Sequence, residues 1–131
     1  MSQWKPTDKA INGKLTSARL AVAHKQFSVL RSDKVYTDLE ELNLFTDEDL
    51  QLGLAAALSE ICSKQYAGCR PPQKSYEEGI GEKELFAFRW DSNHFGRPVY
   101  LKFVDLSNEK GPGLSIVSLH VDRPPAPKRR N

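Results

Sequence analysis

Three segments in the second half of the chain alternate apolar and polar residues with a period of two. This period places successive side chains on opposite faces of a strand, so each segment predicts a half-buried β-strand. Residues 91–97 and 105–113 connect the segments and are rich in turn-forming residues, which favours antiparallel pairing of consecutive strands. The apolar positions are Phe86, Phe88 and Trp90, then Val99, Leu101 and Phe103, then Val117, Leu119 and Val121.

In the first half, apolar residues recur at intervals of three and four, the spacing of a helix with one buried face. We expect residues 1–15 to be flexible. Ser17 can then cap a helix that runs through Leu20 and Val22 toward Phe27.

Two further helices are expected before the strands begin. The run Thr-Asp-Leu-Glu from Thr37 is a capping-box pattern and predicts a short helix that ends near Asn43. The run from Thr46 predicts the strongest helix, because three acids occupy its first turn and its apolar residues share one side. Gly68 and the prolines after it should end that helical segment.

These elements predict an α+β fold in which a helical N-terminal half packs on a C-terminal antiparallel β-sheet meander. The chain has 131 residues, the usual size of one domain. We expect that domain to span residues 16–122, followed by a basic, proline-rich tail over residues 123–131.

Charge is segregated along the chain. The net charge is +2, yet the tail carries four Lys or Arg residues and residues 37–60 carry seven acids with no base. This distribution disfavours non-specific binding of nucleic acid over a broad basic surface, but it is compatible with a local anion site. We expect no membrane span, a cytoplasmic location, free thiols at Cys62 and Cys69, and no metal or cofactor.

Strand alternation also predicts which polar side chains share the other face of the sheet. We assume that Val99, Leu101 and Phe103 pair with Val121, Leu119 and Val117, and that Trp90 and Phe88 pair with Val99 and Leu101. Three polar residues then fall into one row. Those residues are Arg89, Tyr100 and His120, with Lys102 opposite Ser118 one step along.

This row has the groups needed to cleave a phosphodiester without a metal. A histidine can donate or accept a proton near neutral pH, and an arginine can bind two phosphate oxygens at once. Lys102 adds a point charge, Ser118 and Arg97 add donors for substrate, and Tyr100 can orient the phosphate or stack on a base. The same residues are also ordinary occupants of a solvent-facing sheet.

The end of the chain resembles the terminal hairpin of the motility quorum-sensing regulator toxins, a family of mRNA interferases with a RelE-like fold. The residues concerned are Pro-Val-Tyr-Leu-Lys-Phe at 98–103 and Leu-Ser-Ile-Val-Ser-Leu-His at 114–120. Upstream, the run Leu-Glu-Glu-Leu-Asn-Leu at 39–44 and the helix through Leu-Ser-Glu at 58–60 are also similar to the family.

The resemblance implies an endoribonuclease toxin that cuts single-stranded mRNA and is inhibited by an antitoxin. The family's catalytic tyrosine falls on Tyr100, and its helix lysine falls within one position of Lys64. Its late lysine falls on His120, which is a departure. Its glutamine on the preceding strand has no match, and Arg89 is the nearest candidate for that place.

Two other interpretations remain open. The protein can be a non-enzymatic immunity or inhibitor-type partner that uses its acidic helix face to occlude a basic target. It can also be an RNA-binding module without catalysis, in which Tyr100 and Phe95 stack on bases.

Overall fold

The computed structural model describes residues 6–67 and 84–122. Helices occupy most of the first half and pack on a four-stranded sheet formed largely by the second half, which confirms the predicted α+β class. The elements in chain order are α1 (Asp8–Ala23), β1 (Phe27–Val29), α2 (Asp33–Glu41), α3 (Asp47–Ser59), the short 3-10 helix η1 (Ser63–Gln65), β2 (Phe86–Ser92), β3 (Arg97–Asp105) and β4 (Leu114–Val121).

The N-cap of helix α1 lies ten residues earlier than the predicted cap, Ser17. This N-cap is Thr7, whose hydroxyl accepts a hydrogen bond from the backbone N–H of Ala10 at 3.1 Å. The region before Ser17 was expected to be loose, yet Ile11 and Leu15 are fully buried there. Packing of these two side chains stabilises a helix in a segment that otherwise has few apolar residues.

Two predictions on the next segment are wrong. Phe27 does not extend the first helix but opens the strand β1. The cap of α2 is Ser32, whose hydroxyl accepts from the backbone N–H of Val35 at 3.1 Å, so Thr37 lies inside the helix. The helix ends near the predicted place, and Asn43 just beyond it adopts a left-handed φ of 63°, as residues after helix ends often do.

The predicted start of α3 at Thr46 is confirmed, and a capping box closes its first turn. The Thr46 hydroxyl accepts from the N–H of Asp49 at 3.0 Å, and the Asp49 carboxylate accepts from the N–H of Thr46 at 3.2 Å. The α-helix ends at Ser59, so the prediction that it continues until Gly68 is wrong, and the chain continues through η1. The predicted stop at Gly68 and the thiol of Cys69 lie outside the described residues, whereas Cys62 is a free cysteine.

The sheet has the strand order β1-β4-β3-β2. Strands β2, β3 and β4 form the predicted antiparallel meander. The sequence pattern missed β1, which pairs parallel to β4 and makes the sheet mixed. The three described residues of β1 are too few to show a clear alternation.

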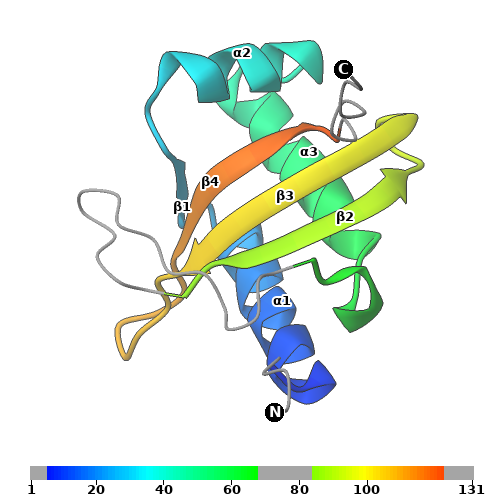
Figure 1. Cartoon of the computed structure of the whole chain (residues 1–131). Coiled ribbons are helices and arrows are strands. Elements are labelled where there is room, and N and C mark those ends of the chain that lie inside the picture. The colour runs from blue at the N-terminus through cyan, green and yellow to red at the C-terminus, as the bar shows by residue number, and fades with distance from the viewer. Residues whose placement is uncertain (1–5, 68–83, 123–131) are drawn as a thin grey trace, which may run out of the picture.

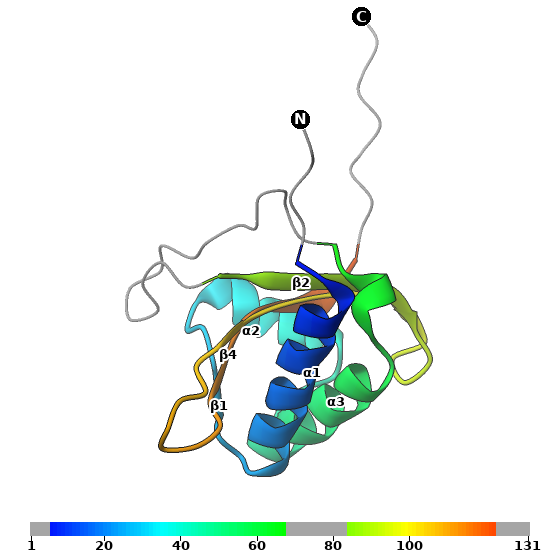
Figure 2. The same cartoon turned by 90° about the horizontal axis from the view of Figure 1, so that it is seen from below.

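The helices lie on one face of the sheet, which we call the inner face (Figure 1). Figure 2 shows the sheet edge-on, with α1 and α3 side by side beneath it. Phe88, Leu101 and Leu119 project from the three meander strands into this interface and are fully buried. The opposite face, which we call the outer face, carries the residues that alternate with them.

A β-bulge alters the predicted facing of β4. The register passes from Lys102 opposite Ser118 directly to Phe103 opposite Ile116, so Val117 is the extra residue and the predicted pairing of Phe103 with Val117 is wrong. Ile116 therefore joins the main core, although it was expected to face outward. Val117 instead packs with Val104 in a second, smaller buried cluster.

Candidate functional site

The structure brings Arg89, Tyr100 and His120 together as the sequence predicted. Arg89 of β2 pairs with Tyr100 of β3, which pairs with His120 of β4. The Arg89 guanidinium carbon lies 4.9 Å from the centroid of the Tyr100 ring. The His120 ring stacks near the same tyrosine, with centroids 5.1 Å apart and planes inclined by 29°. We call these three residues the outer-face row.

One ring nitrogen of His120 is fixed by the backbone. Its Nδ1 lies 2.8 Å from the carbonyl oxygen of Val121. Because a carbonyl oxygen can only accept a hydrogen bond, Nδ1 carries the hydrogen in this arrangement. Nε2 is then the nitrogen that can exchange a proton with a ligand, and the side chain is only partly buried.

The guanidinium of Arg89 is held at one end. Its Nε lies 3.3 Å from Oδ1 of Asp122, and the side chain of Arg89 remains more than half exposed. The backbone N–H of Asp122 donates to the carbonyl of Pro98 at 2.9 Å, which ties this carboxylate to the start of β3. The ion pair engages Nε, which leaves the terminal nitrogens of Arg89 as the natural donors to an anion.

Lys102 and Ser118 lie opposite one another, two residues from the outer-face row on β3 and β4. Both are partly buried. Within residues 6–67 and 84–122, the ion pairs involve other residues, so no carboxylate of this part of the chain pairs with the Lys102 ammonium. Next along the outer face of β3 comes buried Val104, so the polar area ends there.

Two predicted site residues lie elsewhere. Lys64 is exposed on η1, which packs against α1 and β2, and is not part of the row. Arg97 begins β3 opposite Ser92, and its guanidinium lies 3.4 Å from the backbone carbonyl of Glu41 at the end of α2. Because Arg97 shares the inward alternation of Val99, it points to the helix side, away from Tyr100.

Sequence reasoning missed the role of Glu60 at the end of α3. Its carboxylate accepts hydrogen bonds from Nε1 of Trp90 at 2.9 Å, from the hydroxyl of Ser92 at 2.6 Å and from the backbone N–H of His94 at 2.9 Å. These bonds join α3 to the end of β2 and to the turn that follows it. The available signal was an acid at a helix C-terminus, where the helix dipole disfavours negative charge.

The pKa of Glu60 reflects these contacts. Burial alone raises the pKa of this carboxyl, but the hydrogen bonds from Ser92 and Trp90 and from the backbone of the turn outweigh burial and lower it. The hydrogen bonds from these donors therefore stabilise the charged form of the carboxylate. This contact positions the end of β2 that carries Arg89.

The acids of residues 37–60 have different contacts and do not share one role. Asp38 pairs with Lys34 at 3.0 Å, Asp49 caps α3, and Glu60 holds the turn. Of the other four, Glu40, Asp47 and Glu48 line a hollow beside β1, whereas Glu41 lines a separate hollow with Arg97. Negative charge that is available to a ligand is thus concentrated at the hollow beside β1.

Among the described residues, no three His, Cys, Asp or Glu side chains gather as they would around a metal ion. Nor does any helix in the same residues have the length and apolar character to cross a membrane. Comparisons with protein-family models, curated proteins and solved structures found no match.

Proposed function

We propose that the protein is a metal-independent endoribonuclease, an mRNA interferase toxin that is inhibited by an antitoxin in the cytoplasm. Its substrate is single-stranded mRNA, bound on the outer face of the sheet. The observation that carries the proposal is the stacking of Arg89, Tyr100 and His120, with Nε2 of His120 as the ring nitrogen that does not contact the Val121 carbonyl.

The row supports a reaction in which His120 moves one proton. Nε2 removes the proton of a ribose 2′-hydroxyl, and the 2′-oxygen attacks the adjacent phosphorus. The 5′-oxygen leaves and takes the proton back from Nε2. The products are a 2′,3′-cyclic phosphate and a 5′-hydroxyl end, so atoms and charge balance without a further reactant.

The neighbours of His120 suit the charge that develops. The imidazolium formed in the first step lies against the face of Tyr100, where a cation is favoured. The Arg89 guanidinium and the Lys102 ammonium are the groups that would stabilise negative charge on the phosphate. Ser118 adds a hydroxyl beside Lys102.

The resemblance to the motility quorum-sensing regulator toxins supports the same site. Its tyrosine and late lysine positions fall on Tyr100 and His120, and the structure pairs these two residues. The helix lysine position falls near Lys64, which lies outside the row. The proposed chemistry therefore does not use Lys64.

The test is incubation of the purified chain with a long single-stranded RNA in EDTA over a range of pH. We expect discrete cuts that end in a cyclic phosphate, and a loss of about 100-fold or more in rate for His120→Ala. His24→Ala is the matched control, because His24 is an exposed histidine at the end of α1. Intact RNA under all conditions, or equal loss in both variants, would contradict the proposal.

A non-enzymatic immunity or inhibitor-type protein is the second candidate. The observation that favours it is the hollow beside β1, where three acids lie among exposed apolar side chains. RNA that remains intact while a basic protein partner binds would favour this candidate. Binding of RNA without any cleavage would instead favour the RNA-binding interpretation, with Tyr100 as a stacking residue.

A further inference from the structure

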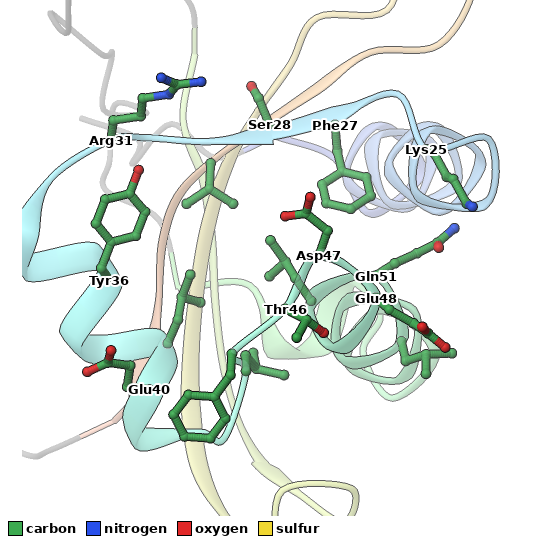
Figure 3. Close-up of a pocket in the computed structure, with 16 residues that line it drawn as sticks. Lys25, Phe27, Ser28, Arg31, Tyr36, Glu40, Thr46, Asp47, Glu48 and Gln51 are labelled. Atoms are coloured by element: carbon green, nitrogen blue, oxygen red, sulfur yellow. The ribbon is translucent and has the colours of Figure 1, made fainter.

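A hollow of about 1000 Å³ lies beside the edge strand β1, between α2 and the start of α3. We call it the β1 hollow. Figure 3 shows Phe27 of β1, Tyr36 of α2 and Asp47 of α3 around it. It involves none of the outer-face row, so an inference from it does not depend on RNA cleavage.

One edge of β1 is open in the described structure, because the strand pairs only with β4. The backbone N–H of Leu30 donates to the carbonyl of Ile116 in β4 at 2.8 Å. In a parallel ladder, the backbone groups of alternate residues bond to the same neighbouring strand. The backbone N–H and C=O of Ser28 therefore also point to β4. Phe27 and Val29 therefore direct their backbone groups to the open edge, and both residues line the hollow.

The mouth of the hollow exposes large apolar side chains. Phe45 is 67% exposed, Leu52 is 61% exposed and Tyr36 is 48% exposed. All three line the hollow, and partly buried Phe27 and Leu50 contribute to its apolar lining. Such a concentration of apolar surface beside an unpaired strand edge is typical of a protein-binding site.

The helix side of the hollow carries a net negative charge. Glu40, Asp47 and Glu48 line it, and none of them has an ion-pair partner in the parts of the chain that the structure describes. Lys25 and Arg31 come from the segments that flank β1. In Figure 3 the Asp47 side chain extends from the start of α3 toward β1. A ligand along β1 would meet this acid at close range.

We propose that the β1 hollow binds an extended, basic segment of a partner protein, which adds a strand to the open edge of β1. Backbone hydrogen bonds to Phe27 and Val29 would give the affinity common to strand addition. Alternate side chains of the segment would then divide between two roles. Apolar ones would cover Phe27 and Phe45, and a Lys or Arg would pair with Asp47.

The chain's own basic tail does not have the chemistry of this occupant. Residues 123–131 contain prolines at 124, 125 and 127. Proline has no backbone N–H, so a segment with this spacing cannot complete a ladder with β1. The expected occupant is therefore a proline-poor segment from another protein.

The experiment is a selection of displayed random 12-residue peptides on the full chain, followed by affinity measurements on synthetic winners. We expect peptides that alternate apolar residues with Lys or Arg and lack proline in the paired part. On binding, the amide hydrogens of Phe27 and Val29 should become protected from exchange. The amide of Ser28 should change little, because it already faces β4.

Two pairs of variants locate the site. Asp47→Lys should weaken binding by about tenfold or more, whereas Asp8→Lys should not. Both aspartates are exposed first residues of helices, so the two changes perturb charge and helix dipole alike. Phe45→Ser should also weaken binding about tenfold, and Leu20→Ser, which removes an apolar residue of α1 that is 50% exposed, should not.

Several results would overturn the proposal. One is a selection that returns no binder, or returns acidic or proline-rich peptides. Another is equal loss of affinity in the Asp47→Lys and Asp8→Lys variants. Protection of Phe27 and Val29 that rises with protein concentration in the absence of peptide would assign the edge to a second copy instead. None of these results bears on cleavage of RNA at His120.

Discussion

The two faces of the meander are built from the same three strands but have different environments. On the inner face, Phe88, Leu101 and Leu119 are fully buried against the helices. On the outer face, each of these residues has a polar neighbour in sequence. The neighbours are Arg89, Tyr100 and His120, which stack in a row and keep their side chains accessible.

The inner face of the meander therefore contributes mainly to folding stability, and the outer face mainly to binding and chemistry. Burial of apolar area is the main favourable term in folding, so the inner face determines whether the sheet forms. The outer face contributes little burial near the row, and its residues can therefore be selected for what they bind. Substitutions on one face should change stability, and those on the other should change binding or cleavage.

The largest effect on stability is expected from an inner-face truncation. Leu101→Ala should lower the free energy of unfolding by about 2–5 kcal/mol, because it leaves a cavity between Phe88 and Leu119. Lys102→Ala, one position further on the same strand, should change it by less than about 0.5 kcal/mol. Chemical denaturation of both variants measures the difference. Similar losses would show that the two faces do not divide these roles.

A smaller but still large effect is expected at Glu60, which joins the helical layer to the sheet. Glu60→Gln should lower the free energy of unfolding by about 1–3 kcal/mol, because the amide accepts fewer hydrogen bonds and directs an N–H₂ group at donors. Glu48→Gln on the exposed side of α3 is the matched control. Loss of the same size in both variants would contradict this role.

The pH dependence of that difference has a defined sign. The pKa of Glu60 is lowered below its ordinary value of 4.5 in the folded protein. Its contribution to stability is therefore fully present above that value and is lost as the pH falls through the lower, folded-state pKa. The gap between the parent and Glu60→Gln should be widest near neutral pH and close in acid. A gap that widens in acid would contradict the assignment.

The row could be predicted because strand alternation and apolar matching fix a register. With Leu101 opposite both Phe88 and Leu119, the positions of Arg89 and His120 beside Tyr100 follow. The start of α3 at Thr46 was predictable because helix-start signals are local in sequence, although the capping-box pattern was assigned to Thr37 and not to Thr46.

The features that were missed depend on distant parts of the chain. Strand β1 has three residues and is defined by its pairing with β4, nearly ninety positions later. The first half of α1 forms where Ile11 and Leu15 are buried by other elements. The Val117 bulge and the contacts of Glu60 likewise arise from tertiary packing, which a local pattern does not contain.

Only a small effect on stability is expected at Asp122, but a change there should alter the binding of RNA on the outer face. Its ion pair with Arg89 lies at the surface, so Asp122→Asn should change the free energy of unfolding by less than about 1 kcal/mol. The same change should tighten binding of a short single-stranded RNA, because a phosphate no longer competes with the Asp122 carboxylate for the guanidinium.

Salt separates this electrostatic effect from a structural one. The gain in RNA affinity for Asp122→Asn should be largest at low ionic strength and shrink as salt screens the charges. Asp8→Asn, which removes an acid at the start of α1, should bind as the parent does at low salt. Weaker RNA binding in Asp122→Asn would mean that Asp122 positions Arg89 rather than competes for it. The carboxylate would then belong to the binding surface itself, and the outer face would use four residues in concert rather than three.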